Sequence, residues 1–60
     1  MKTYVKYRTV RIATQYVAGI LIRSGSGQIR KTDWVKIEKD TYGKSLIDAG
    51  FLIKVSEFKE

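Results

Sequence analysis

The chain has 60 residues, with 12 Lys and Arg against 6 Asp and Glu, a formal net charge of +6, and neither Cys nor His. A chain of this length forms one small domain, residues 1–60, and buries only about 60% of the surface that its unfolded form exposes. The lack of Cys and His excludes disulfides, thiolate or imidazole zinc sites, and catalysis by a Cys or Ser–His system.

Residues 3–14 are rich in Tyr, Val, Ile and Thr, which favours a β-strand. Val5 and Tyr7 share one face of this strand, whereas Val10 falls on the opposite parity. A slip of one residue turns every following side chain to the other face of a strand. We therefore expect a bulge or a short turn near residues 8–9.

Residues 10–21 allow two interpretations. Apolar residues at positions 10, 13, 17 and 20 or 21 recur at helical spacing. The β-branched content and Gly19 favour a strand instead. We favour the strand and keep the helix as the alternative.

The stretch from Gly19 to Lys39 is typical of a β-hairpin, with an apolar run, a turn of Ser and Gly, and a second strand. The glycines of the turn supply positive φ angles. "SGSG" lacks the spacing of a P-loop, so it does not indicate a phosphate cradle. One face of the predicted second strand is apolar, and the other carries Arg30, Trp34 and Lys36.

The next residues predict one short helix near residues 41–49. Asp40 or Thr41 can cap its N-terminus, and Gly50 stands where a left-handed residue ends a helix. Gly43 inside the helix costs about 1 kcal/mol relative to Ala, so tertiary packing must hold the helix. Residues 51–55, "FLIKV", predict a closing strand.

The order of strands, short helix and strand predicts an α+β fold. We expect one small domain with a three- to four-stranded, mainly antiparallel sheet, of the SH3-like or small open barrel kind.

Positive charge is concentrated in the first half of the chain. Residues 1–32 contain seven basic residues and no acid, whereas residues 33–60 contain five basic and six acidic residues. This asymmetry favours a nucleic acid or an acidic protein surface as the partner. Simple solubility is the alternative reason for the charge.

Trp34 among cations suits base stacking, with the cations on phosphates. In the alternative interpretation Trp34 is a core residue that packs against Leu46 and Ile47 of the helix. The candidate nucleic-acid-binding residues are Lys6, Arg8, Arg11, Arg23, Arg30, Lys31, Trp34 and Lys36.

The acidic residues do not indicate catalysis. Asp33, Glu38, Asp40 and Asp48 lie beside lysines and near predicted turns or helix ends, which is typical of solvated carboxylates. A small core also leaves little room for a substrate pocket. We expect that the protein is not an enzyme and that it has neither a cofactor nor a small-molecule substrate.

The sequence predicts no membrane partner and a cytoplasmic location. The N-terminus lacks the apolar run of a signal peptide. The longest apolar run, residues 16–22, is far shorter than the roughly 20 residues that a membrane span needs.

Residues 35–57 combine a strand ending in V-x-I, a helix with L-I-x-A-G and a closing apolar strand. This pattern resembles the C-terminal part of very small proteins encoded among the head, tail or accessory genes of tailed phages and prophages. The resemblance implies a phage accessory, virion or assembly protein in the host cytoplasm, and it implies no functional residues. The matching residues are Val35, Ile37, Leu46, Ile47, Ala49, Gly50, Phe51, Leu52 and Val55.

Two functions therefore remain open. The first is a non-catalytic nucleic-acid-binding module that uses the basic N-terminal hairpin surface. The alternative is a phage-type interaction or virion-assembly component that self-associates or docks on a partner protein through an exposed sheet edge.

Overall fold

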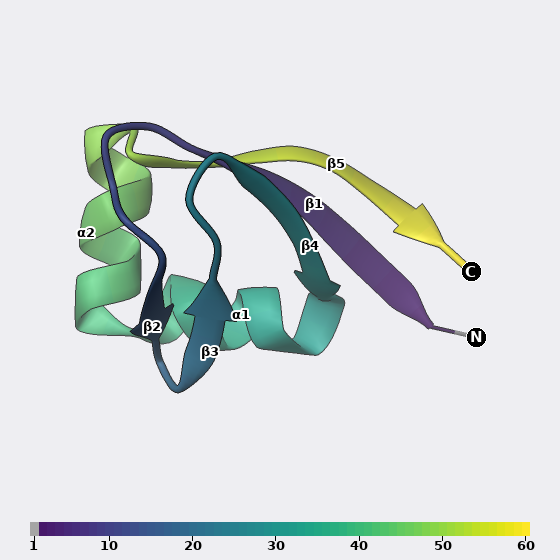
Figure 1. The fold of residues 1–60 in the computed structure, drawn as a ribbon. Coiled ribbons are helices and arrows are strands. Elements are labelled where there is room, and N and C mark those ends of the chain that lie inside the picture. Colours follow the sequence, from purple (N-terminus) through teal and green to yellow (C-terminus); the bar gives the residue numbers. More distant parts are fainter. Residues whose placement is uncertain (1) are drawn as a thin grey trace.

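The computed structural model describes residues 2–60, and within them it contains five strands and two helices (Figure 1). This confirms the predicted class of a small α+β domain built on an antiparallel sheet. No helix in the described part of the chain is long and apolar enough to cross a membrane. The elements are β1 (Thr3–Thr9), β2 (Gln15–Val17), β3 (Ile20–Ile22), β4 (Ser26–Arg30), α1 (Lys31–Lys39), α2 (Thr41–Ala49) and β5 (Leu52–Lys59).

β1 is the central strand of a three-stranded sheet with the order β4-β1-β5, and both neighbours run antiparallel to it. Its side chains alternate as predicted, with Val5, Tyr7 and Thr9 buried on one face. The chain bends directly after Thr9, where Arg11 has a φ of 59°. Of the two predicted causes of the change of phase, a bulge or a short turn, the structure therefore has the short turn. A separate bulge interrupts the pairing of β1 with β5 between Lys6 and Tyr7.

β2 and β3 form a small hairpin of their own, which pairs Gln15 with Ile22 and Val17 with Ile20. Its two-residue connection has positive φ at both positions, 54° at Ala18 and 76° at Gly19, as the tightest hairpin turns require. Strand, not helix, is thus the correct interpretation of the periodic part of residues 10–21.

The predicted hairpin between residues 19 and 39 is wrong. β3 pairs with β2, while β4 pairs with β1 and ends at Arg30. Residues 31–39 form the helix α1, because Trp34 and Ile37 lie one helical turn apart and both bury themselves in the core. The alternation of Ile29, Val35 and Ile37 fits a strand equally well in isolation, and packing decides against it.

α2 agrees with the sequence prediction at both ends. The side chain of Asp40 accepts a hydrogen bond from the backbone N–H of Gly43 at 3.0 Å, and Gly50 ends the helix with a φ of 82°. Gly43 also brings the two helices close together. A β-carbon there would lie 2.8 Å from Cγ2 of Ile37, so only glycine allows this approach without a shift.

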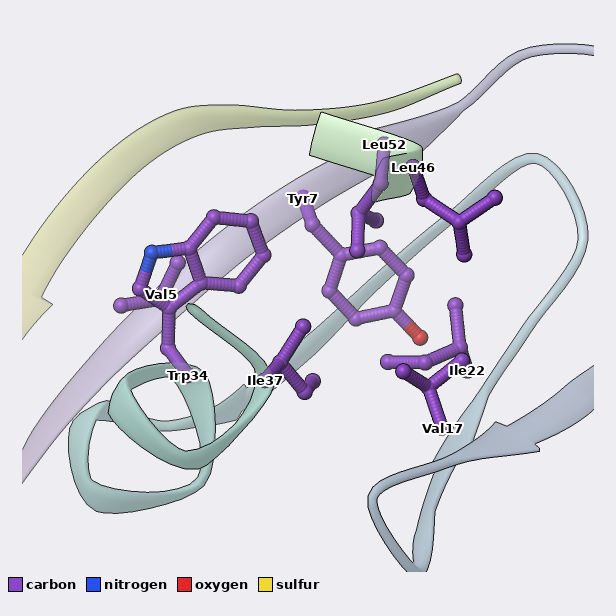
Figure 2. Close-up of a cluster of buried hydrophobic side chains, with 8 residues drawn as sticks. All are labelled: Val5, Tyr7, Val17, Ile22, Trp34, Ile37, Leu46 and Leu52. Carbon is purple, nitrogen blue, oxygen red and sulfur yellow. The ribbon is translucent and has the colours of Figure 1, made fainter. Parts of the chain in front are cut away.

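The core lies between the sheet and the helices, and every element except β4 contributes to its buried cluster (Figure 2). Trp34 is only 3% exposed, so the alternative that placed it in the core is confirmed. In β5 the buried residue is Leu52, whereas Ile53 and Val55 are exposed. The eight buried residues are Val5, Tyr7, Val17, Ile22, Trp34, Ile37, Leu46 and Leu52.

Candidate nucleic-acid interface

The three-stranded sheet has one covered face and one open face. Both helices lie on the same side of the sheet (Figure 1). Because Val5, Tyr7 and Thr9 point toward the core, the residues between them point to the opposite side. We call this side the outer face. By register, its strand residues are Tyr4, Lys6 and Arg8 of β1, Ser26, Gln28 and Arg30 of β4, and Ile53, Ser56 and Phe58 of β5.

Two aromatic rings meet on the outer face. Tyr4 and Phe58 are direct partners in the β1–β5 register, and their rings stack with centroids 5.6 Å apart and planes inclined by 24°. The ammonium nitrogen of Lys6 lies 5.5 Å from the centroid of Phe58. This distance is within the range of a cation–π contact. A half-buried aromatic pair and an exposed cation therefore lie side by side on the outer face.

The cations of the outer face have little competition from acids. Lys6 and Arg8 form no ion pair in the described residues. Arg30 has Asp33 at 3.5 Å, but its side chain is 67% exposed, so the pair is weak. No acidic residue occupies an outward strand position between Thr3 and Lys59.

Glu60 lies at the end of the outer face, next to Tyr4. A hydrogen bond to the carboxylate of Glu60 raises the pKa of the Tyr4 hydroxyl above its ordinary value. The phenol donates this hydrogen bond to the carboxylate, which opposes the loss of its proton.

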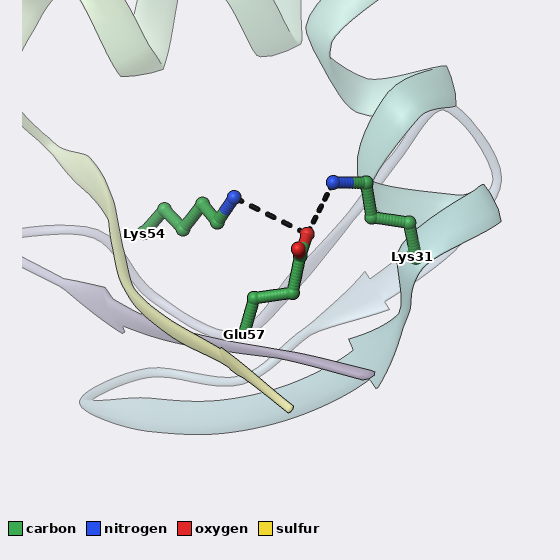
Figure 3. Close-up of polar contacts among 3 residues, drawn as sticks. All are labelled: Lys31, Lys54 and Glu57. Carbon is green, nitrogen blue, oxygen red and sulfur yellow. Dashed lines mark hydrogen bonds and ion pairs between the residues drawn. The ribbon is translucent and has the colours of Figure 1, made fainter. Parts of the chain in front are cut away.

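Glu57, the acid of β5, is directed to the covered side of the sheet. It pairs in register with buried Val5, and its carboxylate contacts Lys31 of α1 and, at 3.3 Å, Lys54 (Figure 3). The hydrogen bond from Lys31 lowers the pKa of this carboxyl, with a smaller contribution from Lys54. This cluster holds Lys31 and Lys54 around one carboxylate on the side of the sheet away from the outer face.

A hollow of about 610 Å³ borders the outer face. Lys6 and Arg23 supply positive charge to its walls, Gln28 supplies amide groups, and Leu21 and Val55 supply apolar surface. The small core led us to expect little room for a pocket. The hollow does not lie in the core, because the strands form it at the surface of the domain.

The structure separates the residues that the sequence grouped into one site. Lys6, Arg8 and Arg30 lie on the outer face, and Arg23 lines the hollow beside Lys6. The others lie elsewhere: Arg11 follows β1 in a loop, Lys31 pairs with Glu57, Lys36 is exposed on α1, and Trp34 is buried.

The predicted binding strand with Arg30, Trp34 and Lys36 on one side is therefore wrong. Arg30 is the last residue of β4, and the other two belong to α1. In their place the structure brings together Tyr4 and Phe58, two half-buried aromatic residues of the outer face. The alternation of Tyr4 with Lys6 and Arg8 in "YVKYR" is a local signal for the first. Phe58 is found only through the register of β5.

No known protein family, curated protein or solved structure matches this chain.

Proposed function

We propose that the protein is a non-catalytic nucleic-acid-binding module, and that it binds through the outer face of the β4-β1-β5 sheet. One observation carries this proposal. Arg30 and Lys6 flank the stacked Tyr4 and Phe58, and Arg8 lies farther along β1 on the same open face, whose strand positions hold no acid between Thr3 and Lys59. Glu60, next to Tyr4, lies at the end of this face.

Electrostatics supports the choice of partner. Like charges on one face repel one another, and an anionic ligand with regularly spaced charges relieves that repulsion at several positions together. Phosphates of a nucleic acid have this regular spacing, and each neutralised phosphate releases condensed counterions. Aromatic rings beside the cations add stacking surface for bases.

Salt-dependent binding by charge-matched variants tests the proposal. In one triple variant Lys6, Arg8 and Arg30 become Gln, and in the other Lys36, Lys39 and Lys44 become Gln. Both variants lose the same number of charges, but the second loses them on the helices. Anisotropy of a labelled oligonucleotide is measured at about 50 mM and about 200 mM salt, the range in which phosphate contacts weaken most visibly.

With one phosphate contact for each of the three cations, the affinity of the wild type should fall by about 20- to 40-fold between these two salt concentrations. The outer-face variant should lose most of the affinity and most of the salt dependence, while the helix variant should retain both. Equal losses in the two variants would show that net charge, not the outer face, drives binding.

One observation favours self-association as a second candidate function. β5 is a free edge strand of eight residues, and Ile53 and Val55 beside that edge are 43% and 61% exposed. Exposed edges of this kind can pair with another chain. Sedimentation equilibrium of the wild type over a wide concentration range tests this candidate, which requires a mass that rises with concentration. A constant monomer mass contradicts it.

A further inference from the structure

We propose that the ligand of the outer face is an unpaired strand, with one base in the hollow and a neighbouring base on the Tyr4–Phe58 stack. This inference rests on the proposed function and specifies its ligand. The juxtaposition that carries it is the position of Lys6, which contacts the ring of Phe58 and also lines the hollow.

The aromatic pair selects against a duplex. In a double helix each base stacks on its neighbours and shows only its edge in a groove. A ring on a sheet face reaches the π-face of a paired base only by unstacking a base step, whereas an unpaired base offers its π-face without that cost. Tyr4 and Phe58 lie on the middle and edge strands of the sheet, where their rings lie along its open face.

The hollow has room for a base and groups that could contact it. Its volume of about 610 Å³ lies within the range of small-molecule sites. Leu21 and Val55 offer apolar walls for the faces of a base, and the amide of Gln28 offers both donor and acceptor groups for its edge. A base inside a duplex could not enter it without leaving the stack.

Positive groups lie where a connecting backbone must pass. Lys6 lies between the hollow and the aromatic pair, and Arg23 lies on the wall of the hollow. A strand that places successive bases at these two positions brings the intervening phosphate next to the ammonium group of Lys6. A point charge on a flexible stem suits such a contact.

The experiment compares four probes of equal length, about ten nucleotides, on the wild-type chain. They are oligothymidylate, oligouridylate, a mixed-sequence DNA duplex, and a single strand of abasic deoxyribose phosphate. The abasic strand offers the same phosphates without bases, so it isolates stacking with no change in the protein. The DNA and RNA strands show which sugar the face accepts.

We expect both strands with bases to bind at least about fivefold tighter than the abasic strand, since one stacked base contributes that much or more. We also expect them to bind tighter than the duplex. Phe58→Leu keeps apolar volume and removes the ring, so it should weaken binding of the strands with bases about fivefold or more and leave duplex and abasic binding unchanged. Thr41→Ser, on α2, serves as the control variant.

The outcomes separate this inference from the proposed function. Equal affinity for all probes, with loss of affinity in the outer-face charge variant, would leave the proposed function intact and overturn the inference. Binding of no probe would overturn both. If Phe58→Leu fails to fold, the comparison of abasic and normal strands on the wild type still decides.

Discussion

The ring of Tyr7 lies directly against Gly27, the residue opposite it in β4. A β-carbon at Gly27 would lie 2.7 Å from Cζ of Tyr7, closer than such atoms can approach. The phenol is fixed at its far end as well, because its oxygen accepts a hydrogen bond of 2.8 Å from the backbone N–H of Arg23. This contact joins the core to the loop that carries Arg23 into the wall of the hollow.

Gly27→Ala should destabilise the domain. The buried ring of Tyr7 cannot move aside cheaply, and overpacking costs about 1–3 kcal/mol. Ala also lowers the conformational entropy of the unfolded chain relative to Gly, but this offsets only about 0.4–1 kcal/mol of that cost. The thermal midpoint should therefore fall, by about 4–8 °C for each net kcal/mol. Ser26→Ala, at the neighbouring exposed position, should leave it almost unchanged.

A double-mutant cycle assigns the cause. Tyr7→Phe removes the hydroxyl that lies closest to the added methyl, so Gly27→Ala should cost less in that background than in the wild type. Strictly additive effects of the two substitutions would contradict the steric explanation.

Trp34→Ala should remove a large part of the stability of the domain. Removing a buried Trp side chain costs about 3–5 kcal/mol. A 60-residue domain has a total stability of about 3–9 kcal/mol, at roughly 0.05–0.15 kcal/mol per residue. Urea unfolding followed by circular dichroism measures the loss, with Trp34→Phe as the milder comparison. An unchanged midpoint for Trp34→Ala would mean that the indole is not part of the core.

The Glu57 cluster makes stability depend on pH on the acidic side. The pKa of Glu57 is lower in the folded protein than its ordinary value of 4.5, so the ionised form favours folding. This contribution is complete above pH 4.5 and is lost as the pH falls through the lowered pKa. Stability differences between the wild type and Glu57→Gln should therefore shrink on acidification.

A side-chain NMR titration locates the cause of the lowered pKa. Lys31 makes the largest contribution, so Lys31→Gln should move the pKa of Glu57 toward 4.5 by more than Lys54→Gln does. The reverse order would contradict the geometry of the cluster.

Asp40→Ala should destabilise the domain by about 1 kcal/mol, because the backbone N–H of Gly43 loses the carboxylate that caps α2. Asp48→Ala removes an exposed acid near the C-terminus of the same helix, where a negative charge is unfavourable. Denaturant midpoints should fall for the first substitution and stay equal or rise slightly for the second. Equal midpoints for both would show that the cap contributes nothing.

α2 and the inner face of β1 could be predicted because their signals are local. Asp40 and Gly50 stand at the two ends of the helix, and Val5 and Tyr7 alternate within a few residues. α1 could not be predicted in this way, because its apolar residues fit the period of a strand as well as that of a helix. Burial of Trp34 among residues from other elements selects the helical one.

In the candidate site, too, some residues have a local sequence signal and others are positioned only by tertiary structure. The sequence indicates Lys6 and Arg8 as basic residues of the first strand, and the alternation observed in β1 places both on one face. Phe58 becomes the partner of Tyr4 only because β5 pairs with β1 across nearly the whole chain. A bulge in that pairing makes simple counting of parity fail along β5. No short segment of sequence contains this information.

Binding through the outer face is tested most directly by titrating the ¹⁵N-labelled wild-type chain with a short oligothymidylate and following the amide chemical shifts. We expect the largest shifts at the outer face and the hollow, with saturation at one strand per domain and reversal by salt. The amides of Lys6, Gln28 and Phe58 should lead the list, and those of α2 should barely move. Shifts centred on the helices, or none at saturating strand, would contradict binding through this sheet.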